Sequence, residues 1–172
     1  MTRKVFGITG WKNSGKTTLT ERLVAEFTRR GYRISTVKHA HHSFDIDKEG
    51  TDSFRHRAAG AHEVAIVSFG RWALMKESRG ALKPPLDQIL ARLAPCDLVL
   101  VEGYKREPHL KIETRRRGAR DTSPLSASDP AIVAVAADHA QPDERLPVLD
   151  IDDIAAIADF IAARMDLRPP AT

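Results

Sequence analysis

The chain has 172 residues, enough for a single domain that buries most of its apolar surface without disulfides or structural metals. The formal charge of +4 and the isoelectric point near 9.4 come from basic residues spread along the sequence, so we expect no nucleic acid partner. Because Cys96 is the single cysteine and no apolar run approaches the roughly 20 residues that span a bilayer, we expect a cytoplasmic protein with no membrane partner.

Hydrophobic periodicity divides the chain into short strands that alternate with helices. In chain order, the predicted elements are a strand at residues 5–9, a helix at 17–30, a strand at 34–38, a helix at 51–59, strands at 64–67 and 72–75, a helix from Pro84, strands at 98–101, 110–114 and 132–136, and a helix at 154–165. Gly70 marks the turn of a predicted β-hairpin. The sequence therefore predicts an α/β three-layer sandwich with a largely parallel central sheet and a hairpin extension.

Two further expectations concern the arrangement of this fold. The first two strands should be parallel neighbours joined by a right-handed crossover. The strand at 98–101 is apolar throughout, as a covered central strand would be, so we place it beside the first strand. The predicted organisation is one domain over residues 1–167, followed by a disordered tail at 168–172.

A phosphate-binding motif joins the first strand to the first helix. The sequence Gly10-Trp11-Lys12-Asn13-Ser14-Gly15-Lys16-Thr17 matches G-x-x-x-x-G-K-[ST] in the strand-to-helix context that the motif requires. Its glycines let backbone N–H groups face phosphate oxygens, and the helix adds the positive end of its dipole. We predict that Gly10, Lys12, Asn13, Ser14, Gly15, Lys16, Thr17 and Thr18 bind a nucleotide. A glycine turn that merely opens a helix is the simpler alternative.

Metal binding at such a loop needs a hydroxyl and a nearby carboxylate. The Thr17 hydroxyl is placed to ligate Mg²⁺, while Lys16 would reach the β and γ phosphates. The apolar strand at 98–101 is flanked by Asp97 and Glu102, and we prefer Glu102 because ligands bind at the carboxyl ends of parallel strands. Alternatively, Glu102 caps a turn at Gly103.

A polar loop follows the second strand and should face the same crevice. It contains His39, His41, His42, Asp45 and Asp47. The spacing fits no tight zinc pattern, so contacts to an anionic ligand or to a Mg²⁺-linked water are favoured over a transition-metal site. An ordinary solvated loop remains the alternative.

Arginines offer less specific signals. Arg55 could touch a phosphate or pair with Asp52 one turn earlier. The run 115–117 with Arg120 is typical of a solvated loop, although an anion-binding role stays open.

Taken together, these motifs resemble those of a known family, the molybdopterin-guanine dinucleotide biosynthesis adaptor family, MobB. The resemblance is carried by residues 7–18, 38–42, 45–47, 50–53, 59–61, 71–75 and 101–105, and it includes residues 133–138 and 149–153.

The resemblance implies a P-loop NTPase fold and a dimeric protein that binds GTP and Mg²⁺ with weak GTPase activity. It implies a role in molybdenum cofactor biosynthesis beside a molybdopterin guanylyltransferase (MobA-like), with molybdopterin or its guanine dinucleotide and molybdoenzymes as further partners. The hairpin around residues 71–77 would be available for dimer contacts.

Two departures limit what is carried over. The guanine-reading motif N-K-x-D is absent, so Asp138 is the nearest candidate to accept hydrogen bonds from guanine. Trp11 stands where related dimeric switches often carry a lysine, so Lys12 receives no role across a dimer interface.

The sequence leaves two other functions open. One is a P-loop small-molecule kinase with Asp45 or Asp47 as base, and the other is a GTP-dependent metallochaperone that uses the histidine loop.

Overall fold

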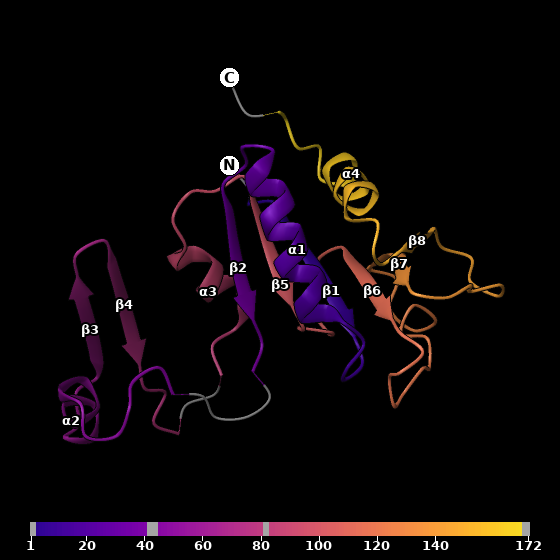
Figure 1. Ribbon diagram of the computed structural model, residues 1–172. Coiled ribbons are helices and arrows are strands. Elements are labelled where there is room, and N and C mark those ends of the chain that lie inside the picture. Colours follow the sequence, from indigo (N-terminus) through magenta and orange to yellow (C-terminus); the bar gives the residue numbers. More distant parts are fainter. Residues whose placement is uncertain (1–2, 41–44, 81–82, 170–172) are drawn as a thin grey trace. The chain divides into compact units, whose positions relative to one another are not determined.

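In the computed structural model, which describes residues 3–40, 45–80 and 83–169, six strands form one parallel sheet with the order β2-β5-β1-β6-β7-β8 (Figure 1). The strands are β1 (Val5–Gly10), β2 (Ile34–Lys38), β5 (Leu98–Glu102), β6 (Lys111–Arg115), β7 (Ile132–Ala137) and β8 (Val148–Asp150). Each strand runs parallel to its neighbours, which confirms the predicted α/β class with a parallel central sheet.

Two helices build the apolar core against one face of this sheet. They are α1 (Lys16–Arg29) and α4 (Ile154–Arg164). Phe6 and Ile8 of β1 are fully buried in one cluster with Leu23 of α1 and Ile157 of α4. Because side chains alternate along a strand, Thr9 faces the other side of the sheet.

The expectation that the first two strands are neighbours is wrong, because β5 lies between β1 and β2. All five residues of β5 are buried, so this strand occupies the middle of the sheet, where both of its edges are paired. The predicted contact between β5 and β1 is confirmed, with Val5 opposite Val99. The short strand β8 was not predicted, since three residues are too few to reveal a period.

Residues 40–92 form a second compact unit, and residues 1–39 and 93–172 form the first. The second unit contains α2 (Asp52–Ala58), β3 (Glu63–Ser68), β4 (Arg71–Lys76) and α3 (Leu86–Arg92). Antiparallel pairing of β3 with β4 confirms the predicted hairpin. The prediction of one domain over 1–167 stays a prediction. Of the predicted tail, residues 170–172 lie outside the described residues.

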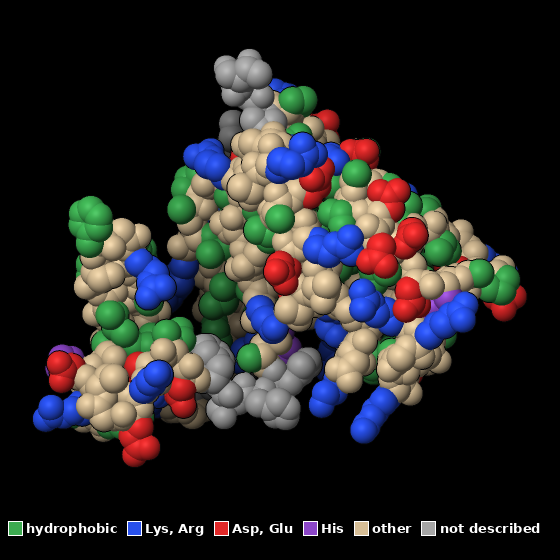
Figure 2. All heavy atoms as spheres, in the orientation of Figure 1, with side chains coloured by type: hydrophobic (Ala, Val, Ile, Leu, Met, Phe, Trp, Pro, Cys, Tyr) green, Lys and Arg blue, Asp and Glu red, His purple; other side chains and the backbone are tan. Residues whose placement is uncertain are grey.

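The second unit is held by ion pairs and exposes apolar side chains. Arg57 lies 3.1 Å from Asp45, 2.9 Å from Asp47 and 3.0 Å from Glu77. Figure 2 shows hydrophobic side chains at the surface of the hairpin. The apolar hairpin surface consists of Ile66, Val67, Phe69, Trp72 and Leu74, each between 37% and 108% exposed. Within the described residues, no helix is both long enough and apolar enough to span a membrane.

Candidate functional site

The loop between β1 and α1 is shaped by glycines at its two ends. Gly10 has a φ of 147°, and a Cβ atom there would lie 2.4 Å from Ser14 Oγ, so a side chain cannot be accommodated. Gly15 has a φ of 93° and precedes the first residue of α1. Thr114 Oγ1 donates to Thr9 O at 3.0 Å and accepts from Ser14 Oγ at 2.6 Å. The loop is therefore anchored to the neighbouring strand β6.

The amino end of α1 is open to an anion. Gly15 offers no side-chain acceptor, and the first turn carries no acidic residue. Its N–H groups and the positive end of the helix dipole therefore face the loop, and the first turn of the helix supplies no carboxylate of its own to neutralise them. Lys12, Asn13, Thr17 and Thr18, which were predicted to bind the nucleotide, are exposed here.

Lys16 is held at the mouth of the loop in an electropositive setting. Its Nζ donates to Trp11 O at 2.6 Å. Burial lowers the pKa of Lys16, and the positive charge of Lys105 lowers it further. An anion bound in the loop would favour the charged amine, so the site is built to gain from a phosphate.

Thr17 and Glu102 meet opposite this lysine. Thr17 Oγ1 donates to Glu102 Oε1 at 2.8 Å, and Lys38 Nζ lies 3.5 Å from the same carboxylate. Glu102 is only 8% exposed. By contrast, Asp97 Oδ2 accepts from Arg33 N at the opposite end of β5. The structure thus brings together the two predicted metal-site residues and separates the rejected carboxylate from them.

The arginine run 115–117 begins at the last residue of β6. Its interpretation from the sequence as a solvated loop is wrong for Arg115. This residue belongs to β6, is 8% exposed, and pairs with Glu113 at 2.8 Å and Glu144 at 2.7 Å. Glu113 in turn accepts from Leu125 N at 2.9 Å and thereby fixes the following loop to the sheet. The alternation of Lys111, Glu113 and Arg115 along one strand face was the signal that could have indicated this network.

Arg116 is a site residue that the sequence left undecided. A Cβ atom on Gly15 would lie 2.8 Å from Arg116 Nε, so the guanidinium rests directly against the phosphate loop. Arg116 Nε is buried and has no hydrogen-bond partner among the described residues. The segment that follows is tied to the same loop, since Trp11 Nε1 donates to Ser123 O at 2.8 Å.

Asp138 lies just past β7, beside the end of β6. Its carboxylate accepts from Arg117 N at 3.1 Å and lies 2.7 Å from His139 Nδ1. The hydrogen bond with His139 lowers the pKa of Asp138, which keeps the side chain an acceptor. Its proposed contact with guanine stays a prediction.

The histidine loop is only partly described. His39 lies near Glu102, whose backbone O accepts from His39 N at 3.0 Å, and its ring lies tilted against that of Tyr104, with 5.1 Å between the centroids. His41 and His42 lie outside the described residues. Among the residues that are described, no group of three or more His, Cys, Asp or Glu side chains is arranged to hold a metal ion.

The remaining predicted residues lie in the second unit. Asp45 and Asp47 both pair with Arg57. Arg55 pairs with Asp52 at 3.8 Å, which is the alternative to a phosphate contact. Their roles toward a ligand stay predictions.

A parallel sheet whose first strand enters a G-x-x-x-x-G-K-T loop, with an acidic residue at the end of the adjacent strand, defines a P-loop NTPase fold. The family model described as molybdopterin guanine dinucleotide synthesis protein B, MobB, matches residues 5–138. The chain therefore belongs to the MobB family.

Named relatives agree with this assignment. The chain is 43% identical to the molybdopterin-guanine dinucleotide biosynthesis adapter protein of Haemophilus influenzae, over 91% of this chain and 86% of that protein. It is 36% identical to the protein of the same name from Escherichia coli, over 94% and 93%. A crystal structure of a MobB protein homolog from Bacillus stearothermophilus superposes with a TM-score of 0.70 at 32% identity, covering 95% of this chain and 99% of that one.

Proposed function

We propose that this protein is a GTP-binding adapter in molybdenum cofactor biosynthesis that assists a molybdopterin guanylyltransferase in attaching GMP to molybdopterin. The names of the two relatives at 43% and 36% identity support the adapter role. The observation that carries nucleotide binding is the phosphate loop itself, with Lys16 at its mouth and Glu102 bonded to Thr17. Molybdopterin or its dinucleotide and molybdoenzymes are the further partners that we expect, in the cytoplasm.

Thr17 and Glu102 are the residues that would hold Mg²⁺. The ion prefers oxygen ligands, and a hydroxyl oxygen and a carboxylate oxygen lie 2.8 Å apart here. When bound, the ion would supply positive charge that offsets the charge of the phosphates. The donor set therefore fits magnesium better than a softer metal.

Arg116 would complete the phosphate site. A buried guanidinium N–H without a partner costs free energy, so its position against Gly15 is explained if a bound phosphate accepts from it. The exposed neighbour Arg120 offers a matched comparison on the same loop.

Hydrolysis by the adapter should be slow. The chain contains only two glutamines, Gln88 and Gln141. Gln141 accepts from Arg115 at 2.9 Å and lies 2.8 Å from His139, so both ends of its side-chain amide are already engaged rather than free to orient an attacking water. The protein is thus at most a weak GTPase, and nucleotide occupancy rather than turnover would govern its partner.

The apolar hairpin surface supports a homodimer. Side chains of this size that lie next to each other on one small sheet mark an interaction surface. A second copy of the chain would cover this surface, in keeping with the symmetric dimers that soluble proteins most often form.

Calorimetric titration with GTP and ATP, with Mg²⁺ present and then chelated, tests the nucleotide assignment. We expect Mg²⁺-dependent binding of GTP in preference to ATP. Lys16→Ala should weaken GTP binding by about 10- to 100-fold, the loss of one charge-assisted contact, whereas the exposed control Lys48→Ala should not. Unchanged affinity in Lys16→Ala would rule out the phosphate loop as the site.

A further inference from the structure

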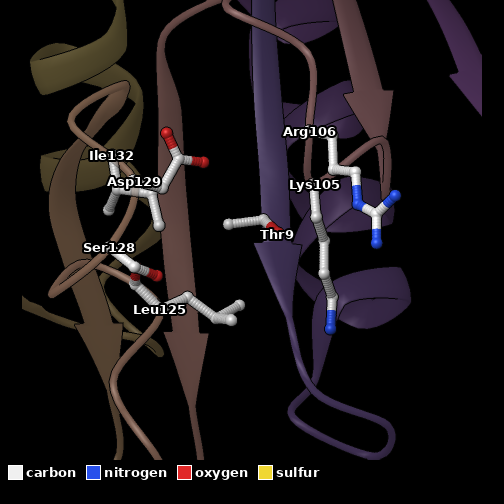
Figure 3. A pocket seen from close by; sticks show the side chains of 7 residues that line it. All are labelled: Thr9, Lys105, Arg106, Leu125, Ser128, Asp129 and Ile132. Carbon is white, nitrogen blue, oxygen red and sulfur yellow. The ribbon is translucent and has the colours of Figure 1, made fainter.

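A cavity of about 360 Å³ lies on the face of β1 that is turned away from α1. Its lining includes Thr9, Lys105, Arg106, Leu125, Asp129 and Ile132. Figure 3 shows Lys105 and Arg106 on one side of Thr9, and Leu125, Asp129 and Ile132 on the other. The volume falls within the range of small-molecule sites, roughly 300–1,000 Å³. All of these residues belong to the first unit.

The wall of the cavity contains a buried hydroxyl group that lacks a hydrogen-bond partner within the part of the chain that the structure describes. Thr9 is 1% exposed, and its Oγ1 has no hydrogen-bond partner among the described residues. Buried polar atoms are rarely left in this state, and a ligand or an ordered water is the usual explanation.

The charges around the cavity favour an anion. Asp129 is already neutralised, because Lys111 Nζ binds one carboxylate oxygen and Ala131 N donates to the other. It therefore does not offset the two cations of the lining, Lys105 and Arg106, although Asp121 and Glu113, which are outside the lining, act on Lys105.

The opposite wall, which also carries Asp129, is partly apolar. Leu125 and Ile132 contribute apolar side chains, and Ser128 adds a hydroxyl beside them (Figure 3). A ligand with an apolar or flat body could lie against these side chains while its charged group faces the two cations.

Lys105 connects this cavity to the phosphate loop. Its Nζ lies 3.6 Å from the centroid of the Trp11 ring, and its charge acts on Lys16. Burial lowers the pKa of Lys105, so an anion beside it would be a favourable addition.

We propose that this cavity binds a small organic anion, a phosphate or carboxylate group on an apolar body, and that Lys105 is shared between this anion and the phosphate loop. Binding draws Lys105 away from the indole ring and changes the surroundings of Trp11. The cavity and its lining do not depend on which nucleotide the loop holds, so the proposal stands apart from the proposed function.

The test uses the full chain with Lys16→Ala, which disables the phosphate loop, and Trp72→Phe, which leaves Trp11 as the one tryptophan of the two in the sequence. Phenyl phosphate and inorganic phosphate are titrated, with calorimetry and Trp11 fluorescence as readouts. We expect saturable 1:1 binding of phenyl phosphate, tighter than that of inorganic phosphate, together with a change in Trp11 emission.

Single substitutions locate the binding. Lys105→Gln and Arg106→Gln should each weaken phenyl phosphate binding by about fivefold or more, and Thr9→Val, which keeps the shape of the side chain, by about threefold. Lys105→Gln should also abolish the fluorescence change. The exposed control Arg145→Gln should bind within about twofold of the parent. Thermal unfolding of each variant verifies that it is folded.

Three results would overturn the proposal: no saturable binding in the Lys16→Ala background, equal affinity for both phosphates, or cavity variants that bind like Arg145→Gln. The proposed function has a separate test, because GTP binding is measured with an intact Lys16. A failure of one is therefore distinguishable from a failure of the other.

Discussion

Each of the two compact units contains an arginine that pairs with two or more carboxylates, but the two clusters contribute differently to the stability of their units. Arg115 is 8% exposed and lies on a strand of the six-stranded sheet, among residues that are already buried. Arg57 has a side chain that is 18% exposed, and the buried apolar residues of its unit that the structure describes are Val64 and Leu86. In the first unit, the ion pairs add to the stability that an extensive apolar core already provides. In the second unit, the apolar core is small, so the ion pairs provide a larger share of the stability.

The comparison explains where binding surfaces can lie. A unit with an extensive core keeps a fixed loop that can be pre-organised for a ligand. A unit with a small core cannot bury its own hairpin side chains, so Trp72 and its neighbours remain available to a partner.

The largest expected effect concerns the buried cluster. Arg115→Met leaves the carboxylate of Glu113 buried without its cation, which should lower the free energy of unfolding by about 3–5 kcal/mol in urea denaturation. In the second unit, Asp45→Asn removes a pair with Arg57 whose carboxylate side chain is 66% exposed, so it should cost at most about 1 kcal/mol, seen as faster hydrogen exchange in residues 45–80 alone. Equal losses in the two variants would contradict the contrast between the units.

An acid titration probes the first unit from another side. Burial, assisted by the charge of Lys111, lowers the pKa of His109 to about 4. Because the folded pKa lies below the unfolded value of about 6.5, the folded state is favoured above pH 6.5, and this advantage is lost as the pH falls towards 4.

At pH 5 the loss from this histidine should be at most about 2 kcal/mol relative to pH 7. His109→Gln should flatten that part of the stability profile, measured by urea denaturation at both pH values. The exposed His62→Gln in the second unit serves as the control and should leave the slope unchanged.

Arg116 tests whether the first unit is pre-organised for phosphate. Arg116→Ala should weaken GTP binding by about tenfold, with GMP affected less than GTP if the contact is to the terminal phosphates. Calorimetry on Arg120→Ala should give a value within about twofold of the parent. A loss shared by both arginine variants would indicate general surface charge instead.

The smallest change in folding stability is expected on the hairpin. Trp72→Ser removes a side chain that is 71% exposed, so the monomer should unfold within about 0.5 kcal/mol of the parent. Dimerisation should weaken by about tenfold, as measured by analytical ultracentrifugation with Lys48→Ala as control. A parent protein that stays monomeric at high concentration would rule out the dimer.

The parts of the fold that could be predicted are those with a local signal. The phosphate loop can be recognised from the spacing of its glycines and Lys16, and the strand that ends at Glu102 from its apolar composition. Once β1 and β5 are parallel neighbours, the loop after β1 and the end of β5 lie at the same edge of the sheet, so Thr17 and Glu102 come within 2.8 Å of each other.

Contacts between distant segments could not be predicted in the same way. Arg115 has a local partner in Glu113, but its second partner, Glu144, is 29 residues away and is brought beside it only by the fold. The same holds for Lys105 over Trp11, since a loop after β5 gives no sign of which ring it will cover. The prediction of the strand order was wrong for the same reason. Local sequence patterns do not indicate that β5 lies between β1 and β2.

That strand order also sets when the molecule can assemble. Strand β1 carries the phosphate loop, but both of its partners, β5 and β6, lie more than 85 residues later in the chain. During synthesis, the loop and its helix therefore leave the ribosome long before the strands that fix them, and residues 40–92 are made in between. Such non-local pairing slows folding, so the strands that fix the nucleotide site are complete only when about two thirds of the chain has been made.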